Sequence, residues 1–215
     1  MNVKLIQEKV SQLFKEEKTG HGWEHIKRVV SNCQMILEEL DDDNINTHIV
    51  IAAAYVHDLI DDKLFTDLIE AEYVTRKLLK DAGANAEEIE AIIDICHKQS
   101  FSANLEKAQS LTIEGQIVQD ADRLDAIGAI GILRTAYYGG SKGHQLYSEE
   151  IDKNPDFKDK SSYRQTENVI QHFYDKLLKI EDLMNTEVAK TIAAQRTVYM
   201  RDFLHQLELE LEGNG

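Results

Sequence analysis

The stretch Ile49-Val50-Ile51-Ala52-Ala53-Ala54-Tyr55-Val56-His57-Asp58-Leu59-Ile60-Asp61-Asp62 joins a run of core-type residues to a histidine and three aspartates. The run is apolar on nearly all sides, so we expect a central helix from about Thr47 to Leu59. Burying ionisable groups against such a helix is costly unless they are paired or bind a metal. His57 and Asp58 are therefore either a satisfied core pair or part of a functional site.

The composition indicates an all-α protein. The chain has 215 residues with one proline, Pro155, and 11 glycines, and its strand-favouring residues form no alternating runs. This length fits one large domain with a substantial core. We therefore predict a single-domain helical bundle over residues 1–215.

Apolar residues at helical spacing give the expected element boundaries. Between 139 and 162 the helical period is absent and the glycine pair and the proline occur, which predicts a long loop or lid. Gly128 and Gly131 fall inside an expected helix, where they favour close helix packing or room for a ligand. The helices are expected at about 3–14, 21–40, 47–59, 67–81, 86–97, 113–138, 163–183 and 186–212.

Charge and cysteine content restrict the partners. The chain carries 24 Lys+Arg against 39 Asp+Glu, a formal net charge of −15. Such an acidic chain repels polyanions, which argues against long DNA or RNA but leaves small phosphorylated ligands open. Cys33 and Cys96 are too few for a disulfide framework and are expected to be buried and reduced. With no membrane span or signal peptide in the sequence, we expect a cytoplasmic protein, either a monomer or a homodimer.

Metal-type side chains occur on three separate expected helices. His21 and His25 lie four residues apart at the start of one helix, and His57-Asp58 closes the next. Asp120, Asp122 and Asp125 follow on a third helix. Two imidazoles and two carboxylates on converging helices can hold a divalent ion and leave positions open for water. Taken separately, each group also has a purely structural explanation: His21 as a residue at the start of a helix, and the aspartates as a solvated acidic face.

These motifs, in this order, resemble those of the HD-domain metal-dependent phosphohydrolases. The resemblance rests on His25 with Ile26-Lys27-Arg28-Val29, on the doublet His57-Asp58, and on Ala121-Asp122-Arg123-Leu124-Asp125. It extends to a subgroup of small single-domain bacterial proteins, some of which hydrolyse nucleoside triphosphates to monophosphate and pyrophosphate. The resemblance implies that the metal ligands are His25, His57, Asp58 and Asp122, with His21 outside the set.

The same resemblance implies that Asp61 and Asp62 position the nucleophilic water. His97 is the best candidate to donate a proton to the leaving group. His97 and the adjacent Lys98 have an equally weighted alternative, as a basic pair that complements a helix C-terminus. We also expect cations to contact substrate phosphates, namely Lys63, Lys98, Lys160 and Arg164.

The leading functional hypothesis is metal-dependent release of pyrophosphate from a (deoxy)nucleoside triphosphate. The cofactor is expected to be a divalent ion, with Mn²⁺ preferred over Fe²⁺, Co²⁺, Ni²⁺ or Mg²⁺. Two other enzyme classes stay open: a nucleoside monophosphate phosphatase, and a cyclic-nucleotide or alarmone-type phosphodiesterase. A non-catalytic, metal-bound nucleotide sensor is the alternative outside enzymes, and the acidic pair Asp61-Asp62 argues against it.

Overall fold

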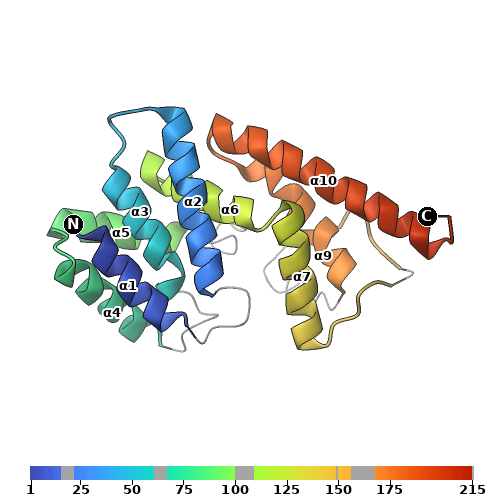
Figure 1. Cartoon of the computed structure of the whole chain (residues 1–215), viewed down its shortest axis with the longest axis horizontal. Coiled ribbons are helices and arrows are strands. Elements are labelled where there is room, and N and C mark those ends of the chain that lie inside the picture. The colour runs from blue at the N-terminus through green and yellow to red at the C-terminus, as the bar shows by residue number, and fades with distance from the viewer. Residues whose placement is uncertain (16–21, 61–66, 100–108, 149, 156–167, 215) are drawn as a thin grey trace. The chain divides into compact units, whose positions relative to one another are not determined.

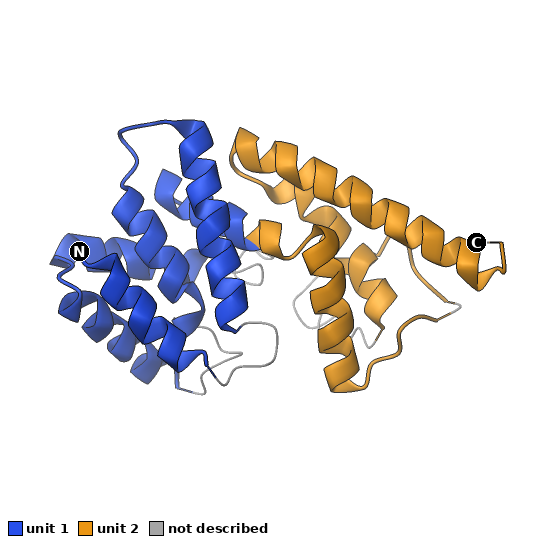
Figure 2. Ribbon diagram, in the orientation of Figure 1, with its two compact units in different colours: residues 1–122 blue, residues 123–215 orange. Residues whose placement is uncertain are grey.

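The computed structural model describes residues 1–15, 22–60, 67–99, 109–148, 150–155 and 168–214 (Figure 1). Within these ranges the regular secondary structure is entirely helical. The one β-type pairing there is an isolated β-bridge between Gln145 and Asn168. The all-α prediction is confirmed. The chain divides into two compact units, Met1–Asp122 and Arg123–Gly215 (Figure 2). No described helix combines the length and apolar character needed to cross a membrane.

The first unit is built around one buried helix. That helix, α3, packs against α1, α2 and α5, and its residues from Ala52 to Val56 are all buried. Asn46 caps its start by accepting a hydrogen bond from the backbone N–H of Ile49. The predicted central position is therefore confirmed. The helices of this unit are α1 (Val3–Leu13), α2 (Trp23–Leu40), α3 (Thr47–Val56), η1 (His57–Ile60), α4 (Leu68–Asp81), α5 (Ala86–Lys98) and most of α6 (Ile113–Asp125).

The end of α3 differs from the prediction. The α-helix stops at Val56 and the chain tightens into the 3₁₀ turn η1. Nδ1 of His57 lies 2.8 Å from the carbonyl oxygen of Ala54. In a continuing α-helix that carbonyl would accept from the amide of Asp58. The His57 side chain thus competes with the helix for its last carbonyls.

The predicted helix 113–138 is wrong as a single element. The chain forms α6 and then α7 (Gly128–Lys142), with a break at Ala126 and Ile127. Gly128 has a φ of +73°, which an L side chain rarely adopts. A Cβ at Gly131 would lie 2.3 Å from the carbonyl oxygen of Ala126. The two glycines thus serve the helix break. The predicted close packing also holds at Gly128, where a Cβ would lie 3.0 Å from Cγ of Arg196.

The second unit contains α7, α9 (Val169–Asp175), η3 (Leu177–Lys179), η4 (Glu181–Leu183) and α10 (Glu187–Leu211), and α10 packs along α7. The predicted loop starts later than expected, because the glycine pair at 139 and 140 lies within α7. The predicted helix 163–183 is also wrong in its described part. The chain leaves helical geometry at Lys176 (φ −135°, ψ −57°) and continues as two short 3₁₀ turns.

Candidate metal centre

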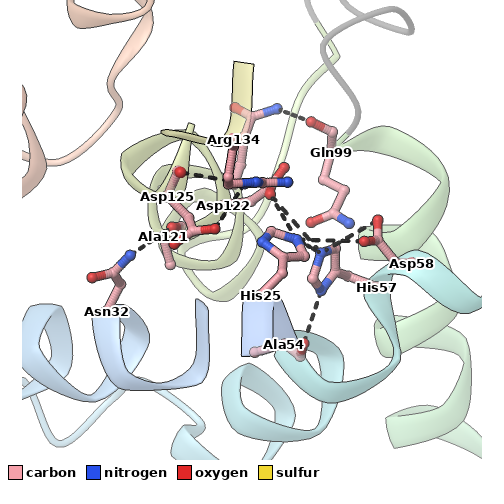
Figure 3. Close-up of polar contacts among 11 residues, drawn as sticks. His25, Asn32, Ala54, His57, Asp58, Gln99, Ala121, Asp122, Asp125 and Arg134 are labelled. Carbon is pink, nitrogen blue, oxygen red and sulfur yellow. Dashed lines mark hydrogen bonds and ion pairs between the residues drawn. The ribbon is translucent and has the colours of Figure 1, made fainter. Parts of the chain in front are cut away.

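A buried group of two histidines and an aspartate lies in the first unit. His25 is in the first turn of α2, and His57 and Asp58 open η1. The three residues are 1%, 2% and 6% exposed. Each offers one ligand atom, and these atoms lie within 4.8 Å of one another, so together they can hold a metal ion. The last turn of α6 brings Asp122 to the same place (Figure 3).

The distances suit a shared cation. The two Nε2 atoms of His25 and His57 are 3.2 Å apart. Nε2 of His25 is 3.4 Å from Oδ2 of Asp58 and 3.4 Å from Oδ1 of Asp122. Nε2 of His57 is 3.4 Å from Oδ1 of Asp58 and 3.9 Å from Oδ1 of Asp122. Ligands about 2.1 Å from one ion in neighbouring coordination positions lie roughly 3 to 3.5 Å apart, so the four side chains fit a divalent metal.

The tautomer of His57 also fits metal binding. Its Nδ1 faces the carbonyl oxygen of Ala54, which can only accept a hydrogen bond, so Nδ1 carries the proton. With the proton on Nδ1, Nε2 is the ring nitrogen left to offer a lone pair on the side of His25 and the carboxylates. Metal-binding histidines commonly donate their other ring N–H to a backbone carbonyl in this way.

One side of the group is more open than the rest. The side chain of Asp122 is 36% exposed, whereas that of Asp58 is 9% exposed. The backbone beside Asp122 is fixed, because Nδ2 of Asn32 donates to the carbonyl oxygen of Ala121 at 3.0 Å. A site with buried ligands and one half-exposed carboxylate keeps room for water or substrate, as catalytic metal sites do.

The acidic character of the site extends to a neighbouring thiol. Burial, together with the charges of Asp122 and Asp120, raises the pKa of Cys33 far above its ordinary range. Cys33 is a buried free thiol and is not part of the group formed by His25, His57 and Asp58.

The other predicted site residues have different surroundings. His97, in the last turn of α5, is exposed, and its Nε2 lies 3.0 Å from a carboxylate oxygen of Glu72 on α4. Lys98 pairs with Asp94 on its own helix at 2.8 Å. The remaining residues lie outside the described part of the chain, namely His21, Asp61, Asp62, Lys63, Lys160 and Arg164.

The sequence reasoning missed Gln99. This residue caps the C-terminus of α5 and is 5% exposed. Figure 3 shows its carboxamide pointing toward His57 and Asp58. No motif marks it, since a glutamine after a helical period reads as an ordinary end of a helix.

The comparisons with known proteins agree with this geometry. The family model of the HD domain matches residues 22–127. The chain is 37% identical to the uncharacterized protein YpgQ of Bacillus subtilis over 205 residues, which cover 95% of this chain and 91% of YpgQ.

Solved structures extend the similarity over the whole chain. A Lactobacillus plantarum protein superposes with a TM-score of 0.85 at 36% identity, covering 99% of this chain and 97% of the other. YpgQ of Bacillus subtilis in complex with ADP superposes with a TM-score of 0.75 at 34% identity, covering 98% and 97%. An HD-superfamily hydrolase of Bacillus thuringiensis gives a TM-score of 0.75 at 33% identity, covering 98% and 96%.

Proposed function

The chain belongs to the HD-domain superfamily of hydrolases, and from that premise we propose that it hydrolyses (deoxy)nucleoside triphosphates to monophosphate and pyrophosphate. The observation that carries the proposal is the buried group of His25, His57 and Asp58, completed by the half-exposed Asp122. A nucleotide substrate is supported by the relative YpgQ, which was crystallised in complex with ADP.

In the proposed site, His25, His57, Asp58 and Asp122 hold one divalent ion, with Mn²⁺ as the preferred metal. Such an ion would lower the pKa of the water bound to it and would neutralise negative charge on the phosphates. Mixed imidazole and carboxylate ligands favour Mn²⁺ and neighbouring transition ions over metals that prefer thiolate ligands. The protein contributes the fixed lone pair of His57 and the two negative charges of the aspartates.

The proposed reaction is attack by a water oxygen on the α-phosphorus. The bond from that phosphorus to the oxygen bridging the α- and β-phosphates breaks, and pyrophosphate leaves. Asp61 and Asp62, which directly follow Ile60 in the sequence, orient the water and accept its proton. Lys63, Lys98, Lys160 and Arg164 contact the phosphates on a chain that is otherwise strongly acidic.

His97 supplies the proton for the leaving oxygen in this proposal. Glu72 holds Nε2 of the ring, and Arg76 in turn holds Glu72 through a 2.7 Å contact from Nε. A ring oriented through one nitrogen is able to donate from the other. Both α4 and α5 pack against η1, so this pair belongs to the same part of the unit as the metal ligands.

Product analysis tests the proposal. The purified protein is incubated with a panel of nucleoside tri-, di- and monophosphates and one cyclic nucleotide, each with Mn²⁺, Mg²⁺, Co²⁺ or Fe²⁺. Phosphate should be detected from triphosphates only when inorganic pyrophosphatase is added, and chromatography should show the monophosphate. Treatment with a chelator should abolish the signal, and Mn²⁺ should restore it.

Other products would contradict the proposal in identifiable ways. Phosphate released from monophosphates without pyrophosphatase indicates a phosphatase, and opening of the cyclic nucleotide indicates a phosphodiesterase. Nucleotide binding without turnover under any metal indicates a sensor.

A further inference from the structure

Gln99 stands where the end of α5 meets α6 in the first unit. Its backbone N–H donates to the carbonyl oxygen of Ile95 at 3.1 Å, at the end of α5. Its carbonyl oxygen accepts from Nε2 of Gln119 on α6 at 3.0 Å. Gln119 is itself buried, at 3% exposed. The backbone of Gln99 is thus held from both sides.

This anchoring fixes Gln99 beside the metal ligands. Gln119 and Asp122 are three residues apart on α6 and therefore lie on the same helix face. Helix α5, which Gln99 closes, packs against η1 with its His57 and Asp58. In Figure 3 the carboxamide extends away from the backbone toward these two side chains.

The side-chain oxygen of Gln99 is buried without a donor. Among the residues that the structure describes, Oε1 has no hydrogen-bond partner, although the residue is only 5% exposed. A buried acceptor left unpaired destabilises a fold, and native proteins rarely keep one without a ligand or a water to satisfy it. The carboxamide that carries this atom points toward His57 and Asp58 in Figure 3, and a cation held by those residues would polarise the water bound to it.

We propose that Gln99 is a positioning residue of the metal centre, whose Oε1 accepts a hydrogen bond from a water molecule on the open side of the bound ion. Water is the better match for Oε1 than a phosphate oxygen, because an acceptor needs a donor and an unprotonated phosphate oxygen has none. The inference rests on the metal site of the proposed function, and it is independent of which nucleotide is hydrolysed.

The first test measures Mn²⁺ affinity without substrate. Free Mn²⁺ is titrated by electron paramagnetic resonance against the wild type, Gln99→Met and Gln116→Met. Gln116 is the matched control, since it lies on α6 and its Nε2 already donates to Leu111 O at 3.2 Å. Loss of an outer-shell partner weakens metal binding about 10- to 100-fold, and we expect this for Gln99→Met and no change for Gln116→Met.

The second test measures melting temperature with and without Mn²⁺. Without the metal, Gln99→Met should melt no lower than the wild type, because it removes an unpaired acceptor, whereas Gln116→Met should melt lower because it loses a hydrogen bond. With Mn²⁺, the wild type should gain more than Gln99→Met. A purely structural glutamine would instead show a lower melting temperature in both conditions.

Two further variants refine the assignment. Gln99→Glu keeps an acceptor at the same distance and should restore Mn²⁺ binding, while Gln99→Asn is too short and should not. Exchangeable-proton couplings in the electron-nuclear double resonance spectrum of the Mn²⁺ protein should change in Gln99→Met and persist in Gln116→Met.

The outcomes separate the inference from its premise. Equal Mn²⁺ affinity in the wild type and Gln99→Met, or unchanged proton couplings, overturns the role of Gln99 and leaves the metal site standing. A wild-type protein that binds no divalent ion overturns both. A wild type that binds Mn²⁺ but hydrolyses no triphosphate overturns the proposed reaction and leaves the role of Gln99 intact.

Discussion

The first unit contains two clusters of histidine and carboxylate that differ in burial. In the first, His25, His57 and Asp58 are almost fully buried and face one another. In the second, His97 meets Glu72 at the surface. Arg76 completes the second cluster through contacts to Glu72 and to Glu90, at 2.7 and 2.6 Å.

This contrast shows what burial does to similar side chains. At the surface, the positive charge that balances the carboxylates comes from an arginine, and water screens the rest. In the buried cluster, lone pairs and carboxylates converge within 4.8 Å, where the low dielectric makes an added divalent cation far more favourable. The buried cluster is therefore suited to hold an ion, and the exposed cluster to orient a ring.

The largest expected effect comes from neutralising one member of the buried cluster. Asp58→Asn keeps the shape of the side chain and removes its charge. Because even outer-shell partners are worth about 10- to 100-fold in metal affinity, loss of a ligand should cost at least roughly 100-fold. Mn²⁺ titration by electron paramagnetic resonance measures this. Asp94→Asn, which breaks an exposed pair with Lys98, is the matched control and should bind Mn²⁺ normally.

The second effect tests whether the exposed cluster takes part in chemistry. His97→Gln keeps a hydrogen-bonding side chain but removes the transferable proton. If His97 protonates the leaving group, kcat should fall roughly 100-fold or more while Mn²⁺ affinity is unchanged. An unaltered kcat would assign His97 to the helix C-terminus alone, where it complements the dipole.

The third effect is a small loss of stability in the exposed cluster. Hydrogen bonds from Arg76, and more weakly from His97, lower the pKa of Glu72, and Arg76 likewise lowers the pKa of Glu90. Carboxylates with lowered folded-state pKa values stabilise the fold above their ordinary value of 4.5, and this contribution is lost as the pH falls through the folded-state values. Loss of the half-exposed contact to Glu72 in Arg76→Ala should cost less than about 1 kcal/mol at pH 7.

Urea unfolding at pH 7 and at pH 3 checks that direction. The difference between Arg76→Ala and the wild type should be smaller at pH 3 than at pH 7, because the lower pH approaches the lowered folded-state pKa values of the glutamates and part of their contribution is lost. A difference that stays constant across this range would show that Arg76 stabilises through packing of its apolar stem instead.

The smallest expected effect concerns Cys96, whose pKa is influenced by one carboxylate from each cluster. Burial, with the charges of Asp58 and Glu72, raises the pKa of Cys96 to about 12. At pH 8 only roughly one thiol in 10,000 is then ionised, so an aromatic disulfide reagent should not label the folded protein. Both Cys96 and Cys33 should react after denaturation. Rapid labelling of the native protein would contradict the burial of the two thiols.

Local signals in the sequence predicted much of the fold. Asn46, Asp67 and Asn85 each cap a helix whose start was expected within a residue or two, since a capping side chain acts on its own neighbours. The break at Gly128 was missed. The sequence around a glycine within a helical period does not show whether its φ is negative, as in a continuing helix, or +73°, as at Gly128. Contacts with residues distant in the sequence decide between the two conformations.

The candidate site likewise contains residues that could be predicted from the sequence and residues that could not. Ligand chemistry marked candidate side chains on three helices, and the resemblance to HD-domain proteins selected His25, His57, Asp58 and Asp122 among them. The structure brings these four side chains together in one place. Gln99 could not be found, because its interest lies in an unpaired buried oxygen, which is a property of packing rather than of residue order. The partner of His97 was equally hidden, since Glu72 lies 25 residues away on another helix.

The helix termini around the metal centre carry a further consequence. Helix α3 ends immediately before His57, α5 ends immediately before Gln99, and α6 ends one turn after Asp122. Among these described helices, α2 alone presents its N-terminal turn, through His25. Each C-terminus carries about half a negative charge, which adds to the charge of the aspartates. An anionic nucleotide approaching this site alone would be repelled by the backbone itself. Binding should therefore be ordered, with the cation first and the nucleotide second.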